Sequence, residues 1–177
     1  DTPRILTVLG ADSVPQDKDQ RASFRLSPAQ REKGLALVRL AALLLFTFPG
    51  APTIYYGDEA GMEGCEDPFN RGAYPWGKED LALKSHFTLL GTLRRQRPSL
   101  QRGSIRWLYT SGPLLAFARE LPDQRTVTVV NASAESHRLT LPWDGTEAAD
   151  RLSGCLFHAA DGMLALELGP LQGLLLT

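Results

Sequence analysis

The fold of this 177-residue chain is decided by one stretch, Gly50-Ala51-Pro52-Thr53-Ile54-Tyr55-Tyr56-Gly57-Asp58-Glu59. Its glycines and prolines, with Pro49 just before it, shape a tight turn out of a helix, because proline lacks an amide hydrogen and disfavours helical geometry in the preceding residue. Thr53 to Tyr56 then has the pattern of a short buried strand. Carboxylates at the exit of a buried strand need partners. We therefore expect Asp58 and Glu59 to hydrogen-bond loop backbone and to order a site there.

A long apolar helix is predicted before this stretch, from Pro28 to Phe48. Ser27 and Gln30 have the spacing of a capping box, and Pro28 suits the first helical position because its absent N–H would be unpaired there. From Leu35 onward the apolar residues cover most of the helix circumference, which indicates burial on more than one side.

After the stretch, Gly57 to Lys78 is rich in Gly, Pro, acidic and aromatic residues without any period, which predicts a long functional loop. A second helix is expected from Asp80 to Gln96, where apolar residues recur at helical spacing before Pro98. The residues ahead of the first helix, Asp1 to Leu26, are polar and aperiodic, and we expect a solvated loop there.

Beyond Pro98 the apolar period changes from 3.6 to 2, as in Ile105, Trp107 and Tyr109. Turn signals such as Asp161-Gly162 separate the alternating runs at the intervals of an antiparallel sandwich. We predict about seven short strands and a domain boundary at Pro98, dividing the chain into residues 1–98 and 99–177. The second part can close its own core, whereas a single strand between two apolar helices cannot complete a β-ladder. The first part is therefore expected to belong to a larger sheet.

Composition excludes several functions. The 19 Lys and Arg balance the 20 Asp and Glu, so charge predicts neither nucleic acid nor a membrane surface as a partner. Leu40 to Phe48 is too short to span a bilayer. The two cysteines and three histidines match no disulfide framework or metal spacing, so free thiols, no metal and no cofactor are expected. The chain starts at Asp1 without a signal-peptide pattern, which favours the cytoplasm and a cut from a longer protein.

The decisive stretch resembles a signature at the eighth strand of the (β/α)₈ barrel of the alpha-amylase superfamily. Ten consecutive positions fit, and the order of buried helix, short strand, long loop, helix and β module also resembles that family. The resemblance implies a fold class of α/β plus all-β, in which a C-terminal remnant of a TIM barrel precedes an antiparallel β-sandwich. The loop after the eighth strand would then lie at the catalytic face of the barrel.

Within that loop, Glu66-Asp67-Pro68-Phe69-Asn70-Arg71 resembles an element of the neopullulanase, cyclomaltodextrinase and maltogenic amylase branch. The resemblance implies that Asp67 and Arg71 bind a glucose unit on the non-reducing side of the cut, the carboxylate accepting from sugar hydroxyls and the guanidinium donating. The alternative is an ion pair within the loop that contributes little. Tyr74 and Trp76 offer rings for sugar stacking, but we expect Trp76 to pack and pin the loop.

The first residues, Asp1-Thr2-Pro3-Arg4, resemble the tail of the family element in which a His-Asp pair ends the seventh strand. The resemblance implies that Asp1 is the third catalytic carboxylate, which hydrogen-bonds sugar hydroxyls and favours the oxocarbenium-like state. A charged chain terminus is the alternative. The nucleophilic Asp and general-acid Glu, which the family carries on earlier strands, do not occur in these residues.

The hypothesis is therefore the C-terminal portion of a retaining hydrolase that acts on maltooligosaccharides, cyclodextrins or pullulan and has no activity of its own. Its first candidate linkage is the α-1,4 glucosidic bond, and the α-1,6 bond is the second candidate. Its partners would be the glucan and the rest of the barrel, and the apolar faces of Leu35 to Phe48 favour association, including a homo-oligomer. A transglycosylase or isomerase of the same superfamily is one alternative. A non-catalytic amylase-like binding or partner subunit is another.

Overall fold

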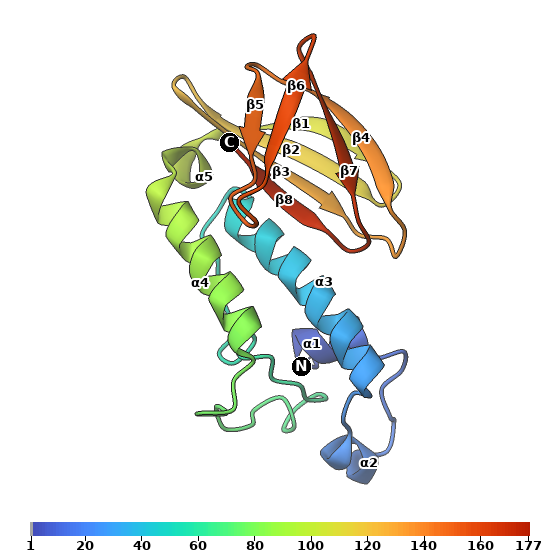
Figure 1. Cartoon of the computed structure of the whole chain (residues 1–177). Helices are drawn as coiled ribbons and strands as arrows, with labels where there is room; N and C mark the ends of the chain where they lie inside the picture. The colour runs from blue at the N-terminus through green and yellow to red at the C-terminus, as the bar shows by residue number, and fades with distance from the viewer. Residues whose placement is uncertain (1) are drawn as a thin grey trace. The chain divides into compact units, whose positions relative to one another are not determined.

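The computed structural model describes residues 2–177 (Figure 1). The chain forms two compact units. We call the first the helical unit; it contains the residues up to Ala41 together with Thr53–Thr88. The second, the sandwich unit, contains Ala42–Pro52 and Leu89–Thr177. Helices α3 (Pro28–Thr47) and α4 (Leu81–Gln96) contribute residues to both units.

Helix α3 begins and ends close to where the sequence predicts. The amide of Ser27 donates to the Gln30 side chain over 3.0 Å, and the amide of Gln30 donates to the Ser27 hydroxyl over 3.3 Å, which is a reciprocal capping box. The helix stops at Thr47, one residue earlier than predicted, ahead of Pro49. Val38, Leu40, Leu43 and Phe46 are all buried, so most of its apolar residues are covered within the chain, although Leu45 and Phe48 stay exposed.

The prediction of a solvated loop for the first 26 residues is wrong in part, because two short helices form there: α1 (Ile5–Gly10) and α2 (Lys18–Ser23). Asp17 caps α2 by accepting from the amides of Asp19 and Gln20. Helix α1 packs closely on α3 through Gly10 and Gly34, where a Cβ on Gly34 would lie 3.0 Å from the Gly10 Cα. Both helices have only six residues, too few to show a helical period in the sequence.

The predicted buried strand at Thr53–Tyr56 is also wrong. Thr53, Ile54 and Tyr55 form no β-ladder with any residue that the structure describes. The side chains of Ile54, Tyr55 and Tyr56 are 40%, 47% and 42% exposed. A strand requires a neighbouring strand to pair with its N–H and C=O groups, and the described residues of this unit contain no strand that could pair with it.

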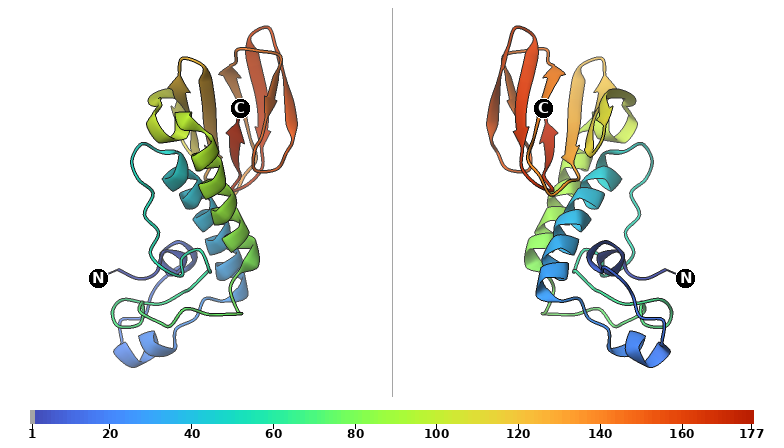
Figure 2. Two further views of the ribbon diagram at one scale, coloured as in Figure 1. Left: turned by 90° about the vertical axis from the view of Figure 1, so that its left-hand side faces the viewer. Right: turned by 90° about the vertical axis from the view of Figure 1, so that its right-hand side faces the viewer.

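The sandwich unit has eight strands in two antiparallel sheets. Figure 2 shows the two sheets as separate layers from two sides. After α5 (Pro98–Arg102), one sheet has the order β1-β2-β3-β8 and the other β4-β7-β6-β5. The strands are β1 (Ser104–Ser111), β2 (Leu114–Leu121), β3 (Gln124–Asn131), β4 (His137–Pro142), β5 (Glu147–Ala149), β6 (Leu156–Ala160), β7 (Met163–Leu168) and β8 (Gly173–Leu176). The antiparallel sandwich is confirmed. It has one strand more than the seven predicted, and β5, with three residues, is too short to show a period in the sequence.

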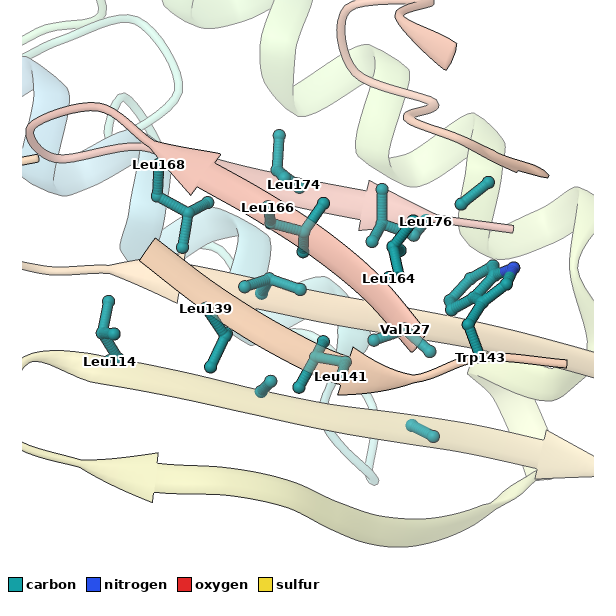
Figure 3. Close-up of a cluster of buried hydrophobic side chains, with 14 residues drawn as sticks. Leu114, Val127, Leu139, Leu141, Trp143, Leu164, Leu166, Leu168, Leu174 and Leu176 are labelled. Carbon is teal, nitrogen blue, oxygen red and sulfur yellow. The ribbon is translucent and has the colours of Figure 1, made fainter. Parts of the chain in front are cut away.

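The core of this unit lies between the two sheets (Figure 3). Leu164, Leu166 and Leu168 of β7 alternate with exposed neighbours and face Leu174 and Val127 across the layer. Each buried leucine contributes about 1.5–3 kcal/mol through removal of apolar surface from water. The period-2 alternation therefore places a row of leucines in the core, and their burial stabilises the sandwich.

The β1-β2-β3-β8 sheet packs on α5 and on Phe48, the residue that follows α3. Phe48 contacts Trp107 and Phe117, with ring centroids 5.8 and 5.3 Å away. Asp150, only 1% exposed, joins the 150–155 loop to β8 by accepting from the amide of Leu175 over 2.9 Å. Both cysteines are free thiols, Cys65 buried and Cys155 exposed.

Candidate functional site

A cavity of about 810 Å³ opens in the helical unit. Its wall is built from three segments that are far apart in sequence: the residues leading into α1, the end of the decisive stretch, and the middle of the 57–78 loop. The lining residues are Thr2, Pro3, Arg4, Ile5, Val8, Tyr55, Tyr56, Asp58, Asn70 and Arg71.

Arg4 lies in this wall and is only 2% exposed. Its Nη1 donates to the Tyr56 carbonyl and to Asp58 Oδ1, the latter over 3.3 Å. The guanidinium carbon also lies 4.4 and 4.5 Å from the ring centroids of Tyr55 and Tyr56, which is cation–π geometry. Its Nε and Nη2 are buried and have no hydrogen-bond partner among the described residues.

Asp58 and Glu59 have different surroundings. Asp58 is paired with Arg4, and burial raises the pKa of its carboxyl, although the Arg4 guanidinium acts in the opposite direction. Glu59 accepts from the amide of Gly57 over 2.9 Å and also interacts with the Tyr74 hydroxyl. Both carboxylates thus contact groups that fix the backbone at the start of the loop.

Asp67 and Arg71 form an ion pair of 2.5 Å between Oδ1 and Nε. Their side chains are 36% and 62% exposed, so both remain reachable from solvent. Arg71 lines the cavity. A carboxylate beside a guanidinium at the rim of a hollow can accept from and donate to neighbouring hydroxyl groups of a sugar.

The prediction that Trp76 packs is wrong, since its side chain is 80% exposed. It contacts Tyr74, with ring centroids 4.6 Å apart. The reason is a tight turn in which the Trp76 amide donates to the Tyr74 carbonyl and the Lys78 amide to the Pro75 carbonyl, both over 2.9 Å. Within this turn the indole contacts Tyr74 and is otherwise open to solvent.

Asp1, the predicted third carboxylate, lies outside the described residues. The next residues, Thr2 and Pro3, line the cavity together with Asp58 and Arg71. Arg4 and Asn70 were not among the site residues predicted from the sequence, although Arg4 stands within the quoted opening motif and Asn70 lies between Asp67 and Arg71. A charged residue directly before the apolar start of α1 was the available signal for Arg4.

Two features that residues 2–177 lack bear on other classes of site. No group of three or more His, Cys, Asp or Glu side chains gathers there in a way that could hold a metal ion. Nor does any helix in this range combine the length and the apolar character needed to cross a bilayer.

Known proteins share the sequence and architecture of this chain. The family described as maltogenic amylase, C-terminal domain, matches residues 105–174, which lie within the sandwich unit. The chain is a homologue of alpha-amylase family enzymes and matches their C-terminal region.

More particularly, the chain is 32% identical to an amylopullulanase of Thermoanaerobacter thermohydrosulfuricus over 99% of its own length, and covers 12% of that enzyme. It is 36% identical to neopullulanase 2 of Thermoactinomyces vulgaris over 80% of its length, and covers 25% of that enzyme. The chain thus spans only a small part of these relatives. An alpha-amylase of Geobacillus thermoleovorans, solved in complex with acarbose, is 26% identical, with a TM-score of 0.74 over 83% of this chain and 35% of that one.

Proposed function

We propose that this chain is the C-terminal portion of a retaining α-glucan hydrolase, in which residues 1–98 complete a (β/α)₈ barrel and residues 99–177 form a β-sandwich domain. One observation carries the proposal: the cavity wall brings the residues directly after Asp1 together with Asp58 and Arg71. The substrates would be maltooligosaccharides, cyclodextrins or pullulan, cleaved at α-1,4 links, with α-1,6 links as the second candidate. The acarbose complex of the related amylase supports a glucan-like ligand.

The proposed roles are those that the resemblance to the amylase family implies, and the chemistry of each group suits them. Asp1 stabilises the oxocarbenium-like transition state, and Asp67 with Arg71 binds a glucose unit. Asp58 and Glu59 order the site, through Arg4 and through the Gly57 amide respectively. A retaining mechanism also requires a nucleophile and a general acid about 5–5.5 Å apart, and the family carries both on earlier strands. We therefore expect no turnover from this chain alone.

The rest of the barrel is the proposed partner of the helical unit. Ile54, Tyr55 and Tyr56 are partly exposed, and the buried Nε and Nη2 of Arg4 lack acceptors among the described residues. Neighbouring barrel strands would supply a ladder for the former and acceptors for the latter.

The glucose-binding role is tested in the complete enzyme that contains this chain, by measuring kcat and KM on maltotriose for Asp67→Ala and Arg71→Ala. Loss of charge-assisted hydrogen bonds worth about 1.5–3 kcal/mol should raise KM roughly 10- to 100-fold. The control is Arg138→Ala, which removes another exposed ion pair, with Glu167, in the sandwich unit. An unchanged KM in both site variants would contradict the role.

Two further measurements test the activity itself. The purified 177-residue chain should release neither glucose nor maltose from these substrates, and release of either would overturn the proposed inactivity. Analysis of the products of the complete enzyme separates hydrolysis from transglycosylation, because transfer yields oligosaccharides longer than the substrate.

A further inference from the structure

Two segments of the helical unit are joined by three hydrogen bonds. Asn70 Nδ2 donates to the Thr2 carbonyl over 3.0 Å. The Arg4 amide donates to the Gly64 carbonyl, and the Gly64 amide to the Thr7 hydroxyl, each over 2.9 Å. These bonds connect the residues that follow Asp1 to the loop that carries Asp67 and Arg71.

The loop side of this connection is held tightly. A Cβ on Gly64 would lie 2.4 Å from the Phe69 carbonyl oxygen, so the backbone at Gly64 and Phe69 is in direct contact. The Phe69 amide donates to the Glu66 carbonyl over 2.9 Å, and the Arg71 amide donates to the Pro68 carbonyl over 3.1 Å. These bonds form consecutive turns around Asn70. Asn70 therefore has a fixed place between the two members of the ion pair.

Asn70 itself is unusual in its hydrogen bonding. It is 8% exposed, and its Oδ1 is buried without a partner among the described residues. A buried acceptor left unpaired costs about 1–3 kcal/mol. Such a group is retained more readily where a function needs it than where it only fills space.

We propose that Asn70 is a positioning residue that fixes the main chain next to Asp1 relative to the Asp67–Arg71 pair, through its bond to the Thr2 carbonyl. This inference rests on the proposed function. In this role the side chain sets the register between the transition-state carboxylate and the glucose-binding pair. A shift of about 1 Å in such a register costs on the order of 100-fold in rate.

The test uses the complete enzyme with Asn70→Asp, which keeps the shape of the side chain but removes the N–H donor. We expect kcat on maltotriose to fall about 10- to 100-fold, while KM changes less than about threefold because Asp67 and Arg71 are intact. Asp67→Ala should show the opposite division, with the larger change in KM. Asn70→Ala, which brings no buried charge, repeats the measurement if the Asp variant does not fold.

The matched control is Asn131→Asp. Asn131 is fully buried in the sandwich unit, where its Nδ2 donates to the carbonyls of Glu135 and Gly169, both over 2.7 Å. This variant should lower Tm without lowering kcat per folded molecule.

If Asn70→Asp lowers only Tm, as the control does, the positioning role is overturned and the proposed function stands. A wild-type enzyme without turnover on any α-glucan would overturn the proposed function, and this inference with it.

Discussion

Two arginines are almost completely buried, one in each unit, and their surroundings differ. Arg119 of the sandwich unit is 1% exposed, and all three of its guanidinium nitrogens donate to the carbonyls of Thr47 and Gly103 at 2.7–3.2 Å. Arg4 of the helical unit is 2% exposed, but only its Nη1 has acceptors among the described residues. The buried guanidinium of the sandwich unit thus finds acceptors for all of its nitrogens within that unit, whereas the buried guanidinium of the helical unit leaves two nitrogens without acceptors in the described part of the chain.

The same contrast holds for the backbone. The strands of the sandwich unit pair within two sheets, while Thr53–Tyr56 has a strand-like sequence and no ladder among the residues described. A sequence can thus form its elements only where the neighbours that complete them are at hand.

The largest expected effect comes from replacing each buried arginine with methionine. Arg119→Met should lower the free energy of unfolding by about 3–5 kcal/mol, because the buried carbonyls lose their donors. Arg4→Met should cost less, about 1–2 kcal/mol, because the loss of its bonds to Asp58 and the Tyr56 carbonyl is partly offset by removal of the cost of burying two unpaired donors. Urea denaturation followed by circular dichroism measures both. Equal losses would contradict the difference between the units.

A somewhat smaller effect is expected from truncating apolar side chains. Leu164 of β7 is fully buried, so Leu164→Ala should cost about 2–4 kcal/mol through lost burial and a residual cavity. Ile54 is 40% exposed, and Ile54→Ala should cost less than about 1 kcal/mol. The same denaturation experiment compares them, and a cost above 2 kcal/mol for Ile54→Ala would show that its segment is packed.

A modest pH dependence is expected from Asp58. Burial raises the folded-state pKa of this carboxyl above its ordinary value of 3.8, with the Arg4 guanidinium acting against the rise. An acid whose pKa is raised on folding binds its proton more tightly in the folded state. Its contribution to stability is therefore full below about pH 3.8 and is lost as the pH rises through the folded-state pKa.

Asp58→Asn provides the reference, because its side chain does not titrate. The stability of the wild type relative to this variant should fall as the pH rises through that window. Unfolding free energies at a series of pH values give this difference. A difference that increases with pH would mean that the Arg4 ion pair outweighs burial.

Much of the fold could be predicted from the sequence because it depends on local patterns. The capping box at Ser27, the helix stop before Pro49 and the alternation in β7 each involve a few adjacent residues, and the structure confirms them. The strand at Thr53–Tyr56 was wrong because a strand depends on partners that its own residues do not specify. Helices α1 and α2 were missed because six residues carry too little periodicity.

The candidate site was less predictable. The resemblance to the amylase family singled out Asp58, Glu59, Asp67 and Arg71, whose chemistry can be recognised from residue type and spacing. Asn70 could not be found in that way, because its bond to Thr2 joins residues 68 positions apart in the sequence. Long-range hydrogen bonds of this kind appear only in the folded chain.

The smallest expected effect on stability belongs to Trp76→Ala, and it extends the comparison to two tryptophans. Trp143 of the sandwich unit is 7% exposed and donates from Nε1 to the Glu147 carbonyl over 2.9 Å, whereas Trp76 is 80% exposed. Trp76→Ala should therefore change the free energy of unfolding by no more than about 0.5 kcal/mol, and a loss above 1 kcal/mol would mean that the indole is packed.

An exposed indole on a tight turn is also a flat apolar surface on which a sugar ring can stack. If the same variant raises KM for maltoheptaose in the complete enzyme while stability is unchanged, the ring contacts glucan; if KM is unchanged too, its contact with Tyr74 does no more than shape the loop.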